Sequence, residues 1–284
     1  MKVLPFVIPK PDLSGLIYQV DDAPIFYDKL HQHEEIQISY IVYGSGTLVA
    51  GDAINQYNQD DIIVIGSNLP HVFKTDNNCI ENSHMISLFF TSSSFGVDFF
   101  QLPEFNGINR FFEEAKQGFK VISDTSGIKS YFNQLKNASK LNRFIILLQI
   151  LEAISNSELE ILSSLTYHKT YSANEGDRMR KIFEFTLDNY KDNITLNDIA
   201  RIANMTKNAF CKYFKKRTNK TYIEFLNELR IQNASQLIIN NNELSMTEAA
   251  ELSGYNNISN FNRQFKKLKR QSPLEFKKSK QVIS

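Results

Sequence analysis

The chain has 284 residues, of which 42% are hydrophobic and 22% are charged, and its formal net charge at pH 7 is +1. This composition is that of a folded globular protein, and the length suits two domains better than one. Two cysteines, Cys79 and Cys211, are too few for a disulfide framework or a four-cysteine zinc site, which is typical of a reducing compartment.

Membrane and secretory segments are not expected. The longest apolar run, residues 144–151, falls far short of the roughly 20 residues that a spanning helix needs. Pro5 and Pro9 interrupt the apolar stretch at the start of the chain, so it lacks the core of a secretory signal. We therefore expect a cytoplasmic protein without a membrane partner.

The small net charge hides an unequal distribution of charge along the chain. Residues 178–284 contain 20 Lys and Arg against 10 Asp and Glu, a net charge of +10, whereas residues 1–177 contain 12 against 21, or −9. A basic module is attracted to a polyanion, so the split favours nucleic acid as a partner of the C-terminal part. An ordinary solvated surface is the alternative explanation, and the positions of the charges must decide.

The first 95 residues predict short strands. Segments rich in Ile, Val, Tyr and Phe are separated by breaks such as Gly51-Asp52, which is a two-residue hairpin signal. The predicted strands are residues 15–22, 34–43, 46–51, 53–59, 61–65, 71–75 and 83–90. This spacing predicts a small antiparallel barrel or a double-sheet jelly roll, which we assign to residues 1–103.

From about residue 104 the apolar spacing becomes helical, and residues 104–165 predict a helical hairpin. An apolar stripe on it must be covered, either by the core of the same chain or by a second copy in a dimer. The stripe consists of Leu141, Phe144, Ile145, Leu148, Leu151 and Leu162. The polar, unpatterned residues 166–177 are the best candidate for a linker.

The last hundred residues predict two short helices joined by a tight turn. Thr195 can cap the first helix, with Asp198 three residues later as an acidic variant of a capping box. Thr206 can cap the second helix, which carries the basic residues. Such a pair is the helix-turn-helix pattern, and we place it at residues 196–218.

The pattern occurs again at residues 246–270. An apolar pair four residues apart, Phe210 and Phe214, returns 51 positions later as Phe261 and Phe265. In each copy a basic run and then a Ser/Thr-x-apolar-Glu-Phe signature follow. The offset is 50 in the first helix and 51 in the second, which indicates one extra residue in the second turn.

These residues resemble the DNA-binding domain of AraC/XylS-type transcription regulators. The second copy carries the most specific part: A-x-x-x-G-Y, then F-x-R-x-F-K-K, then S-P-x-E-F, and the likeness covers residues 178–280. The resemblance implies an all-α DNA-binding domain at residues 178–284 with two helix-turn-helix motifs, presented to adjacent major-groove segments. It also implies double-stranded DNA as a partner, a homodimer, and RNA polymerase as a further partner if the protein is an activator.

The exposed face of each second helix is predicted to read bases, while the phenylalanines on the opposite stripe hold the helix in place. Matched to the family's motif, the predicted base-contacting residues are Lys207, Asn208, Cys211, Lys212, Ser259, Asn262 and Arg263. Arg263 is the strongest of them, since a guanidinium can hold guanine through two bonds. The predicted phosphate contacts are Thr206, Lys215, Lys216, Lys266 and Lys267.

Residues 31–71 carry a second pattern. His31, His33, Gln37 and Gly44, with His71 further on, resemble the cupin pattern H-x-H-x3-E-x6-G followed by a later His, whose four side chains can hold a divalent metal. Gln37 stands where the pattern has a carboxylate, and an amide is a poorer ligand. Three histidines can still hold zinc, so a metal site, a polar pocket and purely structural histidines all stay open.

Regulators of this family often carry a cupin-like module as an effector sensor, and the resemblance over residues 15–95 implies one here. We favour a small-molecule site without a metal or other cofactor. The predicted effector-binding residues are His31, His33, Gln37, Tyr43 and His71. Tyr40 and Tyr43 would suit a sugar, although a barrel core also uses tyrosines.

The expected fold is therefore a multidomain α+β protein: a cupin-like β-barrel, then helices, then an all-α domain with two helix-turn-helix motifs. The favoured function is a non-enzymatic transcription regulator in which an effector in the barrel changes how residues 104–165 pair or dock. The alternatives are a cupin-type metal-dependent enzyme tethered to DNA by its basic tail, and an effector-independent DNA-binding regulator. The glutamine at position 37 and the complete double motif favour the first, so no catalytic residue is expected.

Overall fold

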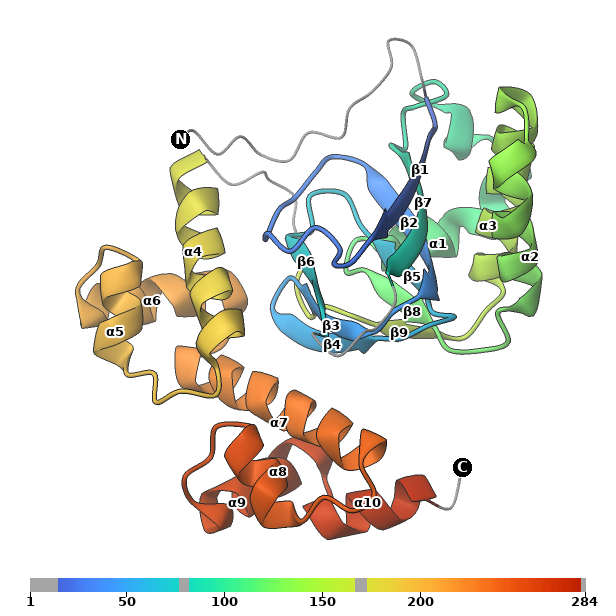
Figure 1. The fold of residues 1–284 in the computed structure, drawn as a ribbon. Coiled ribbons are helices and arrows are strands. Elements are labelled where there is room, and N and C mark those ends of the chain that lie inside the picture. The colour runs from blue at the N-terminus through green and yellow to red at the C-terminus, as the bar shows by residue number, and fades with distance from the viewer. Residues whose placement is uncertain (1–14, 77–81, 167–172, 282–284) are drawn as a thin grey trace. The chain divides into compact units, whose positions relative to one another are not determined.

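The computed structural model describes residues 15–76, 82–166 and 173–281, and the chain divides into two compact units, residues 1–177 and 178–284 (Figure 1). Cys79 and residues 167–172 of the predicted linker lie outside the described residues. Among the helices that are described, none is both long and apolar enough to cross a membrane.

The N-terminal unit is built on two antiparallel sheets. The larger has the strand order β1-β7-β2-β5-β8-β9 and the smaller has the order β4-β3-β6. The predicted strands are confirmed as β1 (Ile17–Ala23), β2 (Ile36–Tyr43), β3 (Gly46–Ala50), β4 (Ala53–Tyr57), β5 (Ile62–Ile65), β6 (His71–Thr75) and β7 (Ser83–Phe90). Gly51-Asp52 makes the tight turn between β3 and β4, where Ala50 pairs with Ala53.

Residues 104–165, for which a helical hairpin is predicted, contain helices and also two short strands. Short 3-10 turns η1 (Phe99–Gln101) and η2 (Pro103–Ile108) lead into α1 (Asn109–Ala115), α2 (Ser126–Gln134), the turn η3 (Leu135–Asn137) and α3 (Lys140–Ser155). Strand β8 (Phe119–Val121) lies between α1 and α2, strand β9 (Leu159–Ile161) follows α3, and the two extend the larger sheet beyond β5. Strands of three residues are too short to show an alternating pattern, so the helical period dominated.

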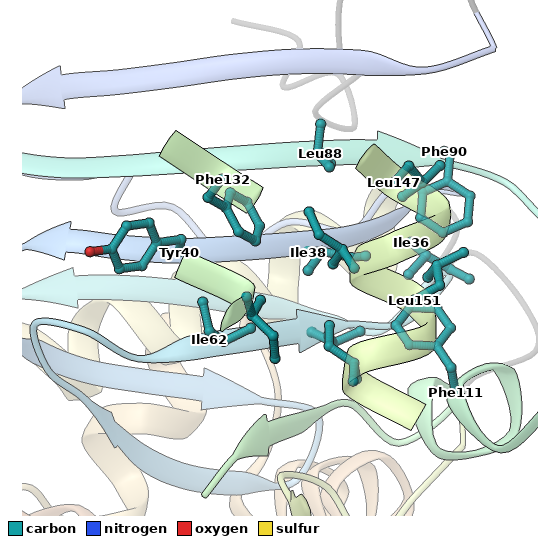
Figure 2. Packing of buried hydrophobic residues seen from close by; sticks show 14 of the residues in the cluster. Ile36, Ile38, Tyr40, Ile62, Leu88, Phe90, Phe111, Phe132, Leu147 and Leu151 are labelled. Atoms are coloured by element: carbon teal, nitrogen blue, oxygen red, sulfur yellow. The ribbon is translucent and has the colours of Figure 1, made fainter. Parts of the chain in front are cut away.

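The middle strands of the larger sheet, β2, β5 and β7, are buried on both faces, and the residues of β2 alternate between those faces. Ile36, Ile38 and Tyr40 face the helices, whereas Ile41 faces the smaller sheet. Figure 2 shows sheet residues such as Ile38 packed against the helices. The helical residues labelled there are Phe111, Phe132, Leu147 and Leu151. Each large side chain buried in this way contributes roughly 1.5–3 kcal/mol.

Helix α3 divides the predicted apolar stripe between core and surface. Leu151 is fully buried, and Phe144 and Leu148 pack against the core from its margin; the outer positions Leu141 and Ile145 are 67% and 46% exposed. The core of the same chain therefore covers one side of the helix, while a dimer seam on the other side stays a prediction. Leu162 does not belong to the stripe, because α3 ends at Ser155 and Leu162 lies in the core between the two sheets.

The C-terminal unit is helical. Its elements are α4 (Ala173–Asn189), α5 (Leu196–Ile202), α6 (Lys207–Thr218), α7 (Tyr222–Asn240), α8 (Met246–Leu252), α9 (Ile258–Lys269) and α10 (Pro273–Gln281). Since α4 begins at Ala173, the last five residues of the predicted linker 166–177 are helical instead. Glu175 lies in the first turn of this helix, where the helix dipole favours a carboxylate.

Capping boxes start most of these helices. Thr195 accepts a hydrogen bond from the backbone N–H of Asp198, whose carboxylate accepts one from the N–H of Thr195, so the predicted box is confirmed. Ser272 and Glu275 make the same exchange before α10. The same pairing at α7 and α8 involves Thr221 with Glu224 and Ser245 with Glu248. The repeated Ser/Thr-x-apolar-Glu-Phe signature is thus the start of α7 and of α10.

Candidate nucleic-acid interface and histidine cluster

The helix pair α5–α6 is repeated as α8–α9, turn included. Asn204 and Gly254, 50 positions apart, both have positive φ, 52° and 84°. In each turn the next N–H donates to the carbonyl oxygen five residues earlier, at an N···O distance of 2.9 Å. The caps of the second helices, Thr206 and Asn257, are 51 positions apart. The predicted extra residue therefore lies in the second turn.

A repeated set of aromatic contacts holds α6 and α9. The rings of Phe210 and Phe214 are 5.8 Å apart, those of Phe261 and Phe265 are 5.6 Å apart, and all four side chains are fully buried. The second ring of each pair also meets the phenylalanine that follows the next capping box. These contacts are Phe214 with Phe225 at 5.7 Å and Phe265 with Phe276 at 5.4 Å. Helices α6 and α9 therefore each pack against the unit through one face, and the opposite face points outward.

The outward faces carry the predicted base-contacting residues. Those exposed are Lys207, Asn208, Lys212, Ser259, Asn262 and Arg263, while Cys211 is half-buried. The Nη2 of Arg263 donates a hydrogen bond to Oδ1 of Asn260 at 2.9 Å, one turn earlier on α9. Sequence reasoning missed Asn260, although the spacing of three residues on a helix is the available signal. This bond links the guanidinium to the preceding turn of α9.

The predicted phosphate contacts are also exposed. Thr206 caps α6, and its hydroxyl accepts from the N–H of Ala209. The exposed lysines of the last turns are Lys215, Lys216, Lys266 and Lys267. Two neighbours in the same basic runs are engaged elsewhere: Arg217 lies 4.2 Å over the ring of Tyr213, and Lys269 donates to Oε1 of Gln232. The basic runs thus contain both outward and structural residues.

One arginine on the connecting helix ties the unit together. Arg230 donates from Nε to the carbonyl oxygen of Tyr190 and from Nη2 to that of Asp192, each at 2.7 Å. Its guanidinium also lies 5.6 Å over the ring of Tyr255, which belongs to the second helix pair. These contacts fasten the turn after α4 and the second pair to α7.

In the N-terminal unit, His31, His33 and His71 lie together. His31 and His71 form an isolated antiparallel bridge, with N···O distances of 3.1 and 2.9 Å. The ring centroids of the three are 4.2 to 5.9 Å apart, and one ring nitrogen from each lies within 4.8 Å of the others. His33 and His71 are buried, and His31 is half-buried.

Each histidine bonds a backbone carbonyl through Nδ1. The acceptors are the carbonyl oxygens of Lys29 for His31, Glu35 for His33 and Leu69 for His71, at 2.8, 2.9 and 2.9 Å. A carbonyl oxygen only accepts, so Nδ1 carries the proton and Nε2 carries a lone pair. Burial lowers the pKa of His31 to about 4 and the pKa of His71 well below its usual value. Both rings are therefore neutral near pH 7.

Gln37 lies beside this cluster. Its Oε1 is 3.3 Å from Nε2 of His33, and its Nε2 donates to Oγ of Ser39 at 2.8 Å. Ser39 is in turn hydrogen-bonded to Ser87 on the neighbouring strand β7. Sequence reasoning missed the two serines, although polar residues at alternate positions of an apolar strand are a signal for a polar strip. All three side chains are buried.

The two tyrosines considered for a sugar do not lie with the histidines. The β2–β7 register shifts between Ile41 and Tyr43. Tyr43 is also six residues from Gln37, roughly 20 Å along the strand, and 36% exposed. Tyr40 packs against Phe132 of α2 on the opposite face of the sheet. The histidines and Gln37 are brought together; Tyr43 is not.

The C-terminal unit has a net charge of +10, and in it buried aromatic rings hold a basic helix behind a tight turn. These features define a DNA-binding unit of the helix-turn-helix class. Comparison with known proteins agrees. Residues 199–279 match the family model of a helix-turn-helix domain.

Relatives extend over most of the chain. The uncharacterized HTH-type transcriptional regulator YdeC of Bacillus subtilis is 25% identical over 257 residues, covering 89% of this chain and 87% of YdeC. The Msm operon regulatory protein of Streptococcus mutans is 25% identical over 250 residues, covering 85% of this chain and 83% of that protein. The crystal structure of ToxT from Vibrio cholerae aligns with 93% of this chain and 97% of ToxT, at 15% identity and a TM-score of 0.37. The protein is a transcription regulator with an AraC-type helix-turn-helix DNA-binding domain.

Proposed function

We propose that both helix pairs of this regulator read DNA, and that the N-terminal unit is a cupin-like sensor for a small-molecule effector. The observation that carries the proposal is the repeat itself: α6 and α9 share turn, caps and aromatic contacts but differ in the side chains that face outward. A scaffold that is kept while the outward face changes is what two readers of different base sequences require.

The connecting helix sets the spacing of the two readers. Helix α7 has 19 residues, which is about 28 Å at 1.5 Å per residue. This length is comparable to the ~34 Å that separates successive major-groove segments on one side of B-DNA. One chain would then bind two adjacent segments, with Arg263 gripping guanine and the outward lysines contacting phosphates.

The polar cluster supports the sensor role. The histidines, Gln37 and the serines beside it place hydrogen-bonding groups in an otherwise apolar interior, as small-molecule sites do. The exposed Leu141 and Ile145 on α3 would form a seam with a second copy, and the effector would change that pairing. RNA polymerase would be a further partner if the protein activates transcription.

Footprinting of the full chain on the DNA upstream of its own gene and of neighbouring genes tests the double reader. We expect two protected segments about one helical turn apart for each chain bound, with affinity that falls steeply as salt rises. Suppose that only one segment is protected and that substitutions on one of the two helices, α6 or α9, leave this protection unchanged. This result would show that only one helix pair reads DNA.

A reporter under the footprinted promoter tests the sensor. Polar small molecules that change its output in the wild type should lose their effect in Gln37→Leu, since the leucine has a similar size but no hydrogen-bonding group. An unchanged response of this variant would place the effector elsewhere.

A further inference from the structure

We propose that Asn260 is a positioning residue for Arg263 and makes α9 the more selective of the two DNA-reading helices. This inference rests on the proposed function, in which the outward faces of α6 and α9 both read bases. It adds a difference between them: α9 selects guanine with an anchored arginine, whereas α6 tolerates more sequences. The support comes from a hydrogen bond, from the places of its two partners on the helix and from the equivalent residues of α6.

The hydrogen bond leaves a guanine-binding edge of Arg263 free. Nη2 of Arg263 donates to Oδ1 of Asn260 at 2.9 Å and so uses one N–H of the guanidinium. Nη2 carries two hydrogens, one beside the N–H of Nε and one beside an N–H of Nη1. Whichever of the two bonds Asn260, an edge with two parallel N–H groups remains. Guanine offers its N7 and O6 to such an edge.

The bond also holds the guanidinium toward the N-terminal end of α9. Asn260 and Arg263 are the third and sixth residues of this helix, which begins at Ile258. Side chains on a helix lean toward its N-terminus, so residues three apart meet on one face. The N-terminal residues of a recognition helix are those that reach base edges. An arginine tied at this end loses less conformational freedom on binding DNA than one that moves freely in solvent.

The acceptor is neutral, which suits a face that binds DNA. A carboxylate at position 260 would offset the charge of the guanidinium and would repel the phosphates. The amide of Asn260 orients the guanidinium and leaves its positive charge. Arg263 is exposed and Asn260 is half-buried, so the pair lies at the surface that α9 presents to solvent.

Helix α6 lacks this pair at the equivalent positions. The offset of 51 residues that relates the two helices aligns Ala209 with Asn260 and Lys212 with Arg263. Alanine has no side-chain acceptor, and a lysine ammonium is a point charge without the planar pair of donors. The anchor and the arginine are therefore replaced together, and Lys212 can meet several acceptors without a strong preference for guanine.

Binding of the full chain to its footprinted duplex, with each base pair replaced in turn, tests the proposal. The losses of affinity at the replaced positions form a base profile. In the wild type we expect the largest loss, about 5–150-fold, at a guanine in the α9 segment, which is the discrimination of a bidentate contact. Asn260→Ala should reduce this loss about 2–10-fold, because the freed arginine must be ordered on binding, and should leave the other losses unchanged. Arg263→Ala should abolish it.

Two controls separate positioning from a structural role. Asn260→Asp keeps an acceptor, so it should keep the guanine preference while it weakens binding to every duplex by repelling the phosphates. Asn260→Ala should unfold at the wild-type temperature or above it, because alanine is the better helix former and the side chain that caps α9 is that of Asn257. A structural role for Asn260 would instead lower the unfolding temperature and weaken binding to all duplexes alike.

Transfer of the pair to α6 tests the proposal in the other direction. Ala209→Asn combined with Lys212→Arg should create a guanine preference in the α6 segment. Lys212→Arg alone is the matched control, since it has the same charge and no anchor, and its preference should be smaller. Equal preferences in the two variants would overturn the role of the anchor.

The base profiles also distinguish this proposal from the proposed function. A profile altered by Arg263→Ala but not by Asn260→Ala would overturn the positioning role alone. A profile that neither change alters would refute the guanine contact and the positioning role with it. If no base of the α6 segment matters while Asn260→Ala alters the α9 segment, the double reader is refuted and the positioning role is supported.

Discussion

Gly254 lies directly against the backbone of Lys191. A Cβ atom on Gly254 would stand 2.8 Å from both Cα and the carbonyl oxygen of Lys191, and equally close to the carbonyl oxygen of Tyr190. Real Cβ atoms do not approach backbone so closely, and the φ of +84° already disfavours a side chain. The turn between α8 and α9 is therefore seated on the segment between α4 and α5, whereas the equivalent Asn204 is exposed.

Gly254→Ala should destabilise the C-terminal unit by about 2–4 kcal/mol. The left-handed conformation costs roughly 1–2 kcal/mol, and displacing packed backbone adds a cost of the size seen on overpacking a core. Asn204→Gly is the control at the equivalent turn and should change stability by only a few tenths of a kcal/mol. Calorimetric unfolding of the full-length variants checks this. Equal losses in both would show that Lys191 does not make the difference between the two turns.

Arg263→Ala should weaken binding to the footprinted site much more than binding to random duplex. The expected loss is about 1–3 kcal/mol on the specific site, since a bidentate contact to guanine disappears. Lys267→Ala is the contrast: an outward lysine that contacts phosphate should weaken both DNAs alike and lower the salt dependence. Titrations at two salt concentrations measure both effects. Equal losses on both DNAs for Arg263→Ala would show that this residue contacts phosphate only.

Local signals made most of the C-terminal unit predictable. Caps such as Thr195 and Thr206 act within four residues, and the pair Phe210 and Phe214 follows from helical spacing alone. Arg230 could not be found in this way, because its partners lie about 40 positions away and are backbone carbonyls, which any residue provides.

The N-terminal unit shows more clearly which features cannot be predicted from the sequence. Long alternating strands such as β2 were found, but β8 and β9 exist only because β5 offers a free edge, to which β8 pairs from more than 50 positions away. The histidine pattern predicted which rings would meet, yet their orientation depends on carbonyls two residues away. The register shift between Ile41 and Tyr43 likewise leaves no mark in the sequence.

Asp52→Ala should destabilise the N-terminal unit by about 2–3 kcal/mol. The buried carboxylate accepts hydrogen bonds from the Ser163 hydroxyl and from both the N–H and the hydroxyl of Ser164. Its removal leaves both donors of Ser164 without this acceptor, while the Ser163 hydroxyl keeps the carbonyl oxygen of Leu165. Ser164→Ala removes one of these bonds and should cost about 0.5–1.5 kcal/mol. Calorimetry of the full chain measures both. A loss in Ser164→Ala as large as that in Asp52→Ala would contradict a shared acceptor.

The capping box before α10 should make the C-terminal unit sensitive to acid. Hydrogen bonds from the backbone N–H and the hydroxyl of Ser272 hold the pKa of Glu275 below its usual value. In the unfolded chain this carboxyl binds a proton more readily, so its contribution to stability is complete above about pH 4.5 and is lost as the pH falls through the lower, folded value.

Glu275→Gln isolates this effect. Glutamine keeps an acceptor at the third helical position but does not titrate. The variant should be less stable than the wild type at pH 7, where the charged acceptor is the stronger one, and the difference should shrink as the pH is lowered toward 3. Urea unfolding of the full chain at a series of pH values measures it. A difference that stays constant with pH would mean that Ser272 does not bind the carboxylate more strongly in the folded state.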